Sequence, residues 1–418
     1  MKKLFTLGLV CSLTLSLSAQ YMKLDASFYS QALDEIKKVD IYLPSDYYDY
    51  DTLTYPVIYF LHGANGNQND YSDVANALYF MISDSLINPF ILVKPDGSCA
   101  PYLGSYYTNS ALYGNYEDFI MQDVIGFIES NFKAIPAKYA RYISGHSMGG
   151  GGSFILSIKY PEVFRAVLAS SNDPCGELIL EPWRQWLYEE NDSSWHFNYN
   201  AGSMTKLYYT SCGAWSPNLE LDPPFNPLID TSGNFVDTVL ARLRLHDPGH
   251  NVRELTVEDR LAFYITCGTN DEFEFYPSNL AFVDTLEKYN IDYQFRPYIG
   301  THAHNIPAFM DGFSFLDSIF KQELLLFEYE NPAAKIDVLI YPNPAQETIN
   351  ISLNSSEPET AVITIYNQLG QRMGNEIPFN TTIGNKELSF DISSFKNGVY
   401  FLQINVDGKM LTNKFIKQ

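Results

Sequence analysis

The residues with the clearest chemical meaning are Gly145-His146-Ser147-Met148-Gly149, which lie between an apolar stretch and a segment that predicts a helix. A serine flanked at two residues' distance by glycines fits a strained strand-to-helix turn, where a Cβ at either glycine would clash with neighbouring backbone. The following helix points its positive end at the serine and favours developing negative charge. We therefore predict that Ser147 is the nucleophile of an acyl-transfer reaction such as ester hydrolysis.

A second turn follows the earlier apolar stretch 57–61 and reads His62-Gly63-Ala64. In sheet enzymes with a serine on such an elbow, one oxyanion donor comes from this early loop and the other from the residue after the serine. We predict that the backbone N–H groups of Ala64 and Met148 form the oxyanion hole. We expect His62 to fix the turn rather than to act as a base.

A serine hydroxyl needs a histidine to take its proton and a carboxylate to hold that histidine in the right tautomer. The expected chain order is serine, then acid, then histidine. Asp271 fits the acid, because it follows the apolar run 261–267 closely. Glu272 beside it and Asp173, after the run 166–170, are the alternatives.

Two histidines compete for the role of base, His302 and His304, and both follow the predicted strand 293–298. Pro307 marks the start of the last predicted helix, which is expected to begin shortly after the base. This position favours His304, and His302 stays open as the alternative.

The histidines and cysteines also permit other chemistry. The His-x-His pair together with His246 and His250 allows a metal site. No spacing of carboxylates in the sequence supports such a site. The predicted serine chemistry implies neither a metal nor a cofactor. Four cysteines follow the first 20 residues, and export permits disulfides. A Cys175–Cys212 pair is the most plausible of the possible pairings, whereas Cys267 reads as a small buried hydrophobe.

Short apolar strands alternate with amphipathic helices over most of the chain, which predicts a doubly wound α/β sheet. The predicted strands are 38–43, 57–62, 90–93, 141–144, 166–170, 261–267 and 293–298, and the predicted helices are 116–132, 149–160, 280–289 and 308–320.

A long irregular stretch, 171–251, interrupts this rhythm and is predicted to be an insertion that acts as a lid over the nucleophile. It holds all four tryptophans, Trp183, Trp186, Trp195 and Trp215. We predict that Trp183, Trp186 and Trp215 bind substrate through an apolar or sugar-stacking surface. The alternative is that the tryptophans fill a small core belonging to the insertion itself.

The chain has 418 residues, too many for a single typical core. We predict a secretory signal peptide at 1–19, from its basic start, apolar run and small final residue, then an α/β domain at 20–327. A linker at 328–335 leads to alternating strands at 336–418, which predict a small all-β sandwich.

The composition excludes some partners. Asp and Glu number 49 against 27 Lys and Arg, and the net charge of −22 disfavours nucleic acid and anionic membranes. The apolar run near the start is too short to span a membrane, and no later stretch reaches that length.

With these residues in place, the segment 24–326 resembles the esterase family that includes feruloyl esterases, acetylxylan esterases and the antigen 85 mycolyltransferases. The matching motifs are Leu61-His62-Gly63, Lys94-Pro95-Asp96-Gly97, Tyr116-Glu117-Asp118-Phe119-Ile120, Gly145-His146-Ser147-Met148-Gly149-Gly150 and Cys267-Gly268-Thr269-Asn270-Asp271. The resemblance implies an α/β-hydrolase fold. The family's histidine motif is matched with two substitutions from His304 to Phe309, while Gly300-Thr301-His302 looks like the Gly-Thr-His of some members.

The tail 336–418 resembles the sorting domain of type IX secretion, through Tyr341-Pro342-Asn343-Pro344, Leu369-Gly370-Gln371, Asn397-Gly398-Val399-Tyr400 and a basic end. The resemblance implies export by the outer-membrane type IX machinery, followed by release or attachment at the cell surface. The alternative is a sugar-binding or adhesive sandwich.

The sequence as a whole predicts a secreted serine carboxylesterase with the triad Ser147, Asp271 and His304. Its expected substrates are esters on polysaccharide, feruloyl or acetyl groups on xylan, or related small esters. A short-chain or lipid esterase and an acyltransferase are alternatives of the same fold. A non-catalytic glycan-binding protein at the cell surface is the alternative from another class.

Overall fold

The computed structural model describes residues 21–49, 53–198, 200–330, 336–355, 360–367, 372–380, 384–406 and 409–418. The chain divides into two compact units, Met1–Lys321 and Gln322–Gln418. The predicted signal peptide at 1–19 lies outside the described residues. Helix α10 (Ile306–Glu330) continues through residues 328–330, which are the first residues of the predicted linker at 328–335. Residues 331–335 lie outside the described ranges.

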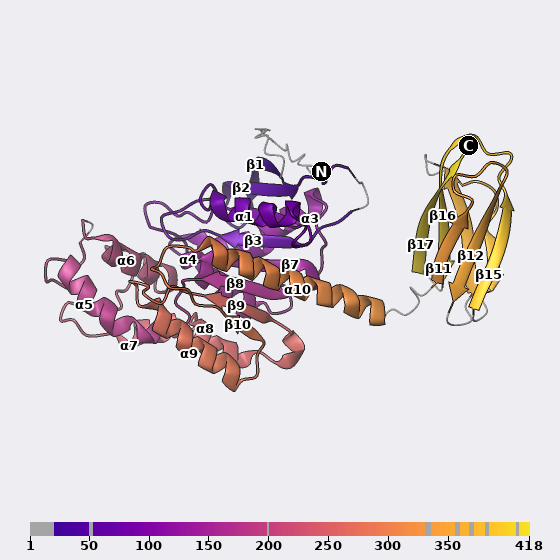
Figure 1. Ribbon diagram of the computed structural model, residues 1–418. Helices are drawn as coiled ribbons and strands as arrows, with labels where there is room; N and C mark the ends of the chain where they lie inside the picture. Colours follow the sequence, from indigo (N-terminus) through magenta and orange to yellow (C-terminus); the bar gives the residue numbers. More distant parts are fainter. Residues whose placement is uncertain are drawn as a thin grey trace. The chain divides into compact units, whose positions relative to one another are not determined.

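Within the described part of the first unit, eight strands form one sheet in the order β1-β2-β4-β3-β7-β8-β9-β10 (Figure 1). Its strands are β1 (Tyr21–Ser30), β2 (Glu35–Pro44), β3 (Val57–Leu61), β4 (Ile91–Pro95), β7 (Arg141–His146), β8 (Ala166–Ser170), β9 (Ala262–Thr266) and β10 (Tyr293–Phe295). Strands β4 through β10 in this order run parallel, and β1 and β2 add an antiparallel edge. The predicted doubly wound sheet is confirmed.

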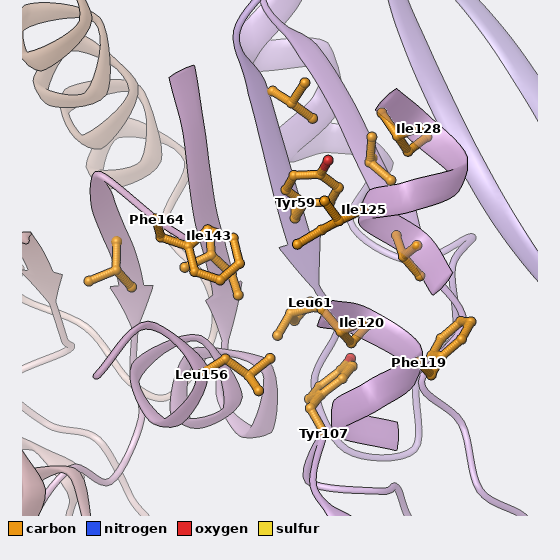
Figure 2. Packing of buried hydrophobic residues seen from close by; sticks show 14 of the residues in the cluster. Tyr59, Leu61, Tyr107, Phe119, Ile120, Ile125, Ile128, Ile143, Leu156 and Phe164 are labelled. Carbon is orange, nitrogen blue, oxygen red and sulfur yellow. The ribbon is translucent and has the colours of Figure 1, made fainter. Parts of the chain in front are cut away.

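Alternate residues of each central strand face opposite layers of helices. On β3, Tyr59 and Leu61 lie in one buried cluster and Ile58 and Phe60 in another. Figure 2 shows part of the first cluster, where Tyr59 and Leu61 pack near the helical segment around Ile120. Since both faces are covered, the strands read as continuous apolar runs, which is typical of parallel sheets.

Helices α3 (Ile125–Asn131), α4 (Met148–Lys159) and α9 (Phe275–Lys288) contribute to the first cluster, and α1 (Ser72–Ser83) and α10 contribute to the second. A short helix α2 (Tyr116–Asp118) and a π-helical turn (Phe119–Val124) run directly into α3. A two-stranded ribbon pairs β5 (Asn109–Ser110) with β6 (Gly114–Asn115).

The predicted insertion between β8 and β9 is helical rather than irregular. It contains α5 (Leu180–Glu190), α6 (Ser203–Trp215), α7 (Asp237–Arg244) and α8 (Pro248–Asn251), with short 3₁₀ turns at Gly176–Leu178, Val252–Glu254 and Val257–Asp259. Pro182 in α5 and Pro248 in α8 both lie in a first turn, where a missing N–H costs no intrahelical hydrogen bond. The insertion has its own buried cluster, which includes Leu187, Tyr208 and Phe225.

The second unit consists of two antiparallel sheets, ordered β11-β12-β15 and β14-β13-β16-β17. Their strands are β11 (Ile336–Tyr341), β12 (Thr348–Ser355), β13 (Thr360–Asn367), β14 (Ile377–Asn380), β15 (Gly384–Asp391), β16 (Gly398–Val406) and β17 (Lys409–Lys417). Residues from both sheets, such as Ile351 and Leu402, share one buried cluster. The predicted all-β sandwich is confirmed.

All four cysteines in the described ranges are free, so the suggested Cys175–Cys212 disulfide is not formed. Cys267 is fully buried, as predicted. Of the helices that the structure describes, none combines the length and the apolar character needed to cross a membrane.

Candidate active site

Ser147 lies on a sharp turn between β7 and α4, with φ 56° and ψ −123°. Its N–H donates to the Ser170 carbonyl at 2.9 Å, which ties the turn to the neighbouring strand β8. A Cβ at Gly149 would lie 1.9 Å from the Leu61 carbonyl oxygen, and one at Gly145 would lie 2.4 Å from the Gly149 backbone. The elbow geometry is therefore as predicted, and it is possible only because glycines occupy these two positions.

We expect Gly149→Ala to unfold or strongly destabilise the protein, because the obstructing atoms belong to the backbone of a central strand. Overpacking of this kind costs about 3 kcal/mol or more, which lowers the Tm by roughly 5–10 °C. Gly151→Ala is the matched control, since nothing lies within 4 Å of a Cβ there and alanine favours helix. Thermal unfolding of both variants measures this difference, and equal Tm values would contradict it.

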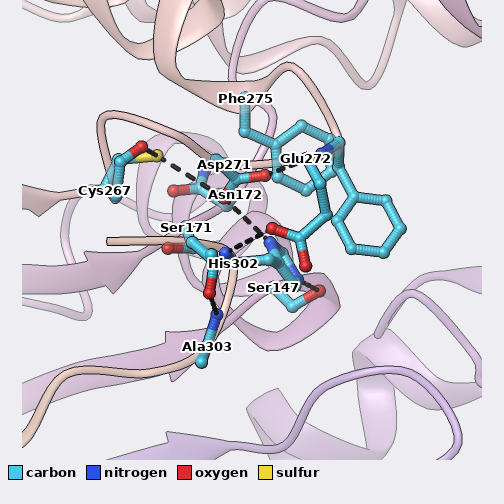
Figure 3. A network of polar contacts seen from close by, with 12 residues as sticks. Ser147, Ser171, Asn172, Cys267, Asp271, Glu272, Phe275, His302 and Ala303 are labelled. Atoms are coloured by element: carbon cyan, nitrogen blue, oxygen red, sulfur yellow. Dashed lines mark hydrogen bonds and ion pairs between the residues drawn. The ribbon is translucent and has the colours of Figure 1, made fainter. Parts of the chain in front are cut away.

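The side chains of Ser147, His302 and Asp271 form one hydrogen-bonded chain (Figure 3). His302 Nε2 lies 2.9 Å from Ser147 Oγ, and His302 Nδ1 lies 2.9 Å from Asp271 Oδ2. The Asp271 side chain is fully buried, while the His302 side chain retains 14% exposure. A buried carboxylate on Nδ1 keeps the proton on that nitrogen and leaves Nε2 free to accept the serine proton.

The structure corrects the choice between the two histidines. His304 Nε2 lies 2.7 Å from Asp73 Oδ2, in the first turn of α1, whereas the histidine at Ser147 Oγ is His302. Nearness to the next helix misled the prediction, because the segment before α10 directs the His302 ring to Ser147 and the His304 ring to Asp73. His302 thus occupies the position predicted for His304.

Two loops hold the acid and the histidine together. The N–H groups of Thr269 and Asn270 donate to the carbonyls of Tyr298 and Gly300, both at 2.9 Å. A Cβ at Gly268 would lie 2.2 Å from the Thr301 carbonyl oxygen, so only glycine permits this approach.

Glu272, an alternative for the acid, holds the backbone instead of the ring. Its carboxylate accepts the N–H of His302 at 2.8 Å. The other alternative, Asp173, accepts a hydrogen bond from Ser278 Oγ at 2.6 Å. Of the three carboxylates, Asp271 is the one that contacts the His302 ring.

A second histidine, His146, supports the loop that carries His302. Its Nε2 donates to the His302 carbonyl at 2.8 Å, and its Nδ1 accepts from the Tyr71 hydroxyl at 3.0 Å. Burial lowers the pKa of His146 to about 3, so its ring is neutral and can make both bonds. The Tyr71 hydroxyl also accepts from the Gly63 N–H, and this chain of contacts reaches the loop before Ala64.

His62 fixes the same loop, as predicted. Its Nε2 accepts the Gly97 N–H at 2.9 Å, so Nδ1 carries the proton and donates to the Gly63 carbonyl at 2.8 Å. Burial also lowers the pKa of this histidine, which favours the neutral ring. Ala64 and Met148, the predicted oxyanion donors, both line the pocket that contains Ser147.

This pocket has a volume of about 440 Å³ and extends from Ser147 and His302 into the insertion. Trp183 and Trp215, two of the three tryptophans predicted to bind substrate, line it. Trp186 does not belong to its lining, and its ring packs against Phe273, with the centroids 5.9 Å apart. The remaining lining is mostly apolar and includes Tyr106, Leu180, Leu187, Leu207, Ile229 and Phe275.

The histidines of the proposed metal alternative are dispersed among other partners. His302 and His304 each contact a carboxylate, and the His246 ring stacks on Trp215 at 5.7 Å. Among the residues that the structure describes, no group of three or more His, Cys, Asp and Glu side chains could hold a metal ion.

The sheet order, the elbow after β7 and the helices on both faces define an α/β-hydrolase fold with an insertion after β8. The chain belongs to the Putative esterase family, whose model matches residues 30–309. A solved structure of a ferulic acid esterase shares this fold, with a TM-score of 0.51 and 19% identity over 72% of this chain and 99% of that one.

Curated relatives match only in part. An esterase of Mycobacterium tuberculosis is 31% identical over 134 residues, which are 32% of this chain and 28% of that protein. An endo-1,4-beta-xylanase/feruloyl esterase of Xylanibacter ruminicola is 27% identical over 155 residues, 33% of this chain and 20% of that protein. The chain thus matches less than a third of the length of either relative.

Residues 339–418 match the secretion system C-terminal sorting domain. The predicted resemblance of the tail to a type IX sorting domain is therefore confirmed. A domain of this kind indicates an exported protein, either secreted or held at the cell surface.

Proposed function

We propose that this protein is a serine carboxylesterase in which Ser147 is the nucleophile, His302 the base and Asp271 the residue that orients the base. The observation that carries the proposal is the hydrogen-bonded chain from Ser147 Oγ through the His302 ring to the buried Asp271 carboxylate. No metal or cofactor enters this mechanism.

The reaction follows from the positions of these groups. Ser147 Oγ attacks the ester carbonyl while His302 Nε2 takes its proton, and the resulting oxyanion is stabilised by the N–H groups of Ala64 and Met148. Collapse of the intermediate expels the alcohol, which receives the proton from His302. Water then attacks the acyl-enzyme with His302 again as base, which releases the acid and restores the serine.

For the substrate we propose an ester of a bulky, apolar acyl group, with feruloyl groups on xylan favoured over acetyl groups. An acetyl group would leave most of the 440 Å³ pocket unfilled, whereas an aromatic acid can pack against Trp183 and Phe275. The name of the Xylanibacter ruminicola relative supports this choice. The sorting domain supports a site of action outside the cell, where polysaccharide is found.

Aliphatic acyl esters are a second candidate, because leucines and Ile229 line the part of the pocket formed by the insertion. Such a lining suits an alkyl chain as well as a ring. The two candidates differ in the acyl group that the pocket prefers, not in the mechanism.

We expect 4-nitrophenyl ferulate to be hydrolysed with a kcat/KM roughly 50-fold or more above that of 4-nitrophenyl acetate, after division of each by its uncatalysed rate. Burial of roughly 100 Å² of ring surface is worth about 2.5 kcal/mol, which corresponds to roughly 70-fold in kcat/KM. A matching series that includes 4-nitrophenyl decanoate tests the aliphatic candidate. A preference for acetate would refute the bulky acyl group, and a preference for decanoate would favour the alkyl chain.

A further inference from the structure

One carboxyl group stands out in the pocket beside Ser147. Asp173 lines the pocket and is partly exposed, although most of its surroundings are apolar. It follows Ser170, whose carbonyl accepts the Ser147 N–H at 2.9 Å. Three residues of chain span at most about 11 Å, so the carboxyl lies within the reach of an acyl group attached to Ser147.

The carboxyl of Asp173 is held in place rather than free to turn away. Its Oδ1 accepts from Ser278 Oγ at 2.6 Å, and Ser278 Oγ in turn accepts the Cys175 N–H at 2.9 Å. Ser278 is itself fully buried on α9, so this support is rigid. The proposed ester chemistry does not use Asp173, because Asp271 already holds the His302 ring.

The surroundings of Asp173 make an unpaired charge costly. Burial raises the pKa of the Asp173 carboxyl to about 7, and the nearby Asp247 carboxylate raises it further. The Cys175 thiol and the Tyr106 phenol also interact with it, and burial raises the pKa of each. Glu177, Arg244 and His246 line the same pocket, and burial lowers the pKa of His246. The arginine that lines the same pocket, Arg244, forms its ion pair with Glu177, and it is not among the groups that shift the pKa of Asp173.

We propose that Asp173 accepts a hydrogen bond from a hydroxyl group on the acyl part of the substrate, and so makes the pocket selective for hydroxylated aromatic acids over their unhydroxylated analogues. This inference rests on the proposed esterase function and specifies its substrate class further. A phenolic hydroxyl adds a donor to the carboxylate, whereas a bare ring or an alkyl chain buries the charge with Ser278 Oγ as its side-chain donor and no donor from the ligand.

The size of the effect follows from the cost of an unsatisfied charged group. Hydrogen bonds to charged groups are worth about 1.5–3 kcal/mol, which corresponds to roughly 10- to 150-fold in kcat/KM. Sites built to bind a substrate hydroxyl discriminate strongly against the analogue that lacks it. We therefore expect the wild-type protein to prefer methyl 4-hydroxycinnamate over methyl cinnamate by at least about tenfold.

The test compares this ratio of kcat/KM values in the wild type, Asp173→Asn and Glu181→Gln. Asparagine has the same shape and keeps an acceptor for Ser278, so we expect the fold to persist while the ratio falls to roughly one. Glu181→Gln is the matched control, because it removes the same charge from the insertion at a side chain that is 65% exposed and outside the pocket lining. Its ratio should stay at the wild-type value.

The pH dependence of the ratio gives a second readout. Both esters use the same triad, so the titration of the triad cancels in the ratio of their kcat/KM values. The change of this ratio with pH that remains reports the titration of Asp173. The wild-type ratio should rise as the pH passes upward through about 7, since the charged carboxylate is the stronger acceptor. In Asp173→Asn the ratio should not change with pH.

Folding of the variant can be checked independently. The folded pKa of about 7 lies above the ordinary value of 3.8, so the native state holds this proton more tightly and stability falls as pH rises from about 4 to 7. Asp173→Asn removes this loss of stability, and its Tm at pH 8 should equal or exceed that of the wild type.

Two results would overturn the role of Asp173 alone. These are an active wild type whose ratio of kcat/KM values is near one, or an Asp173→Asn variant whose ratio is unchanged. Hydrolysis of neither ester, without labelling by a fluorophosphonate, would instead refute the esterase function.

Discussion

Ser147→Ala is expected to lower kcat for methyl ferulate by roughly 10⁴-fold or more while the protein stays folded. Without the hydroxyl no acyl-enzyme can form, and only the background effects of binding and the oxyanion hole remain. Alanine keeps the Cβ and fits the same turn between β7 and α4, so the Tm should change little. Steady-state kinetics and thermal unfolding of the same preparation measure both effects.

A matched control is available in the same helix. Ser153 is fully buried, and its Oγ donates to the Gly149 carbonyl at 2.7 Å, so Ser153→Ala also removes a hydroxyl close to the elbow. We expect Ser153→Ala to retain most of the wild-type kcat. The Ser153 hydroxyl bonds to a backbone carbonyl four residues earlier in the same helix and does not contact the triad. If Ser147→Ala kept more than about a tenth of wild-type activity, Ser147 would not be the nucleophile.

His302→Gln is expected to lower kcat by roughly 10³-fold or more, whereas His304→Gln should leave it within roughly fivefold. His302 is the residue within 2.9 Å of both Ser147 Oγ and Asp271 Oδ2. His304 pairs with Asp73, whose side chain is 55% exposed, and such exposed pairs are worth about 0–1 kcal/mol. The two variants make the same chemical change two residues apart, and kcat for methyl ferulate compares them.

The pH profile distinguishes a lost base from a distorted loop. A missing general base leaves a rate that rises with hydroxide concentration, without the inflection that a titrating histidine gives to the wild-type profile. His304→Gln should keep that inflection. A large loss in His304→Gln with little loss in His302→Gln would reverse the assignment that the structure favours.

Much of the fold was predictable from local patterns. The buried strands β3, β7, β8 and β9 are continuous apolar runs, and their predicted positions agree with the structure to within a residue or two at most ends. Strand β1 was missed, although Leu24, Ala26 and Phe28 alternate with more exposed residues, which is the signal of a half-buried edge strand. The helices of the insertion were missed, because the stretch 171–251 was predicted to be irregular.

The site was only partly predictable, for a physical reason. Ser147 and Asp271 lie at strand ends, where the glycines Gly145, Gly149 and Gly268 mark close backbone contacts in the sequence itself. The choice of His302 over His304 depends on which way each side chain points, and the two motif matches, Gly300-Thr301-His302 and His304 to Phe309, favoured different histidines. The support of the His302 loop by His146 and Tyr71 likewise joins residues that are far apart in sequence.

Mass spectrometry of the acyl-enzyme tests the central claim most directly. The protein is mixed with excess methyl ferulate, quenched in acid within the first turnovers and digested with trypsin, which releases the peptide 142–159 between Arg141 and Lys159. We predict a single feruloyl group on Ser147 of this peptide, absent from Ser147→Ala and increased in His302→Gln if deacylation slows more than acylation. Hydrolysis of the ester with no adduct on this peptide, or with the adduct at another residue, would contradict a serine esterase built on Ser147.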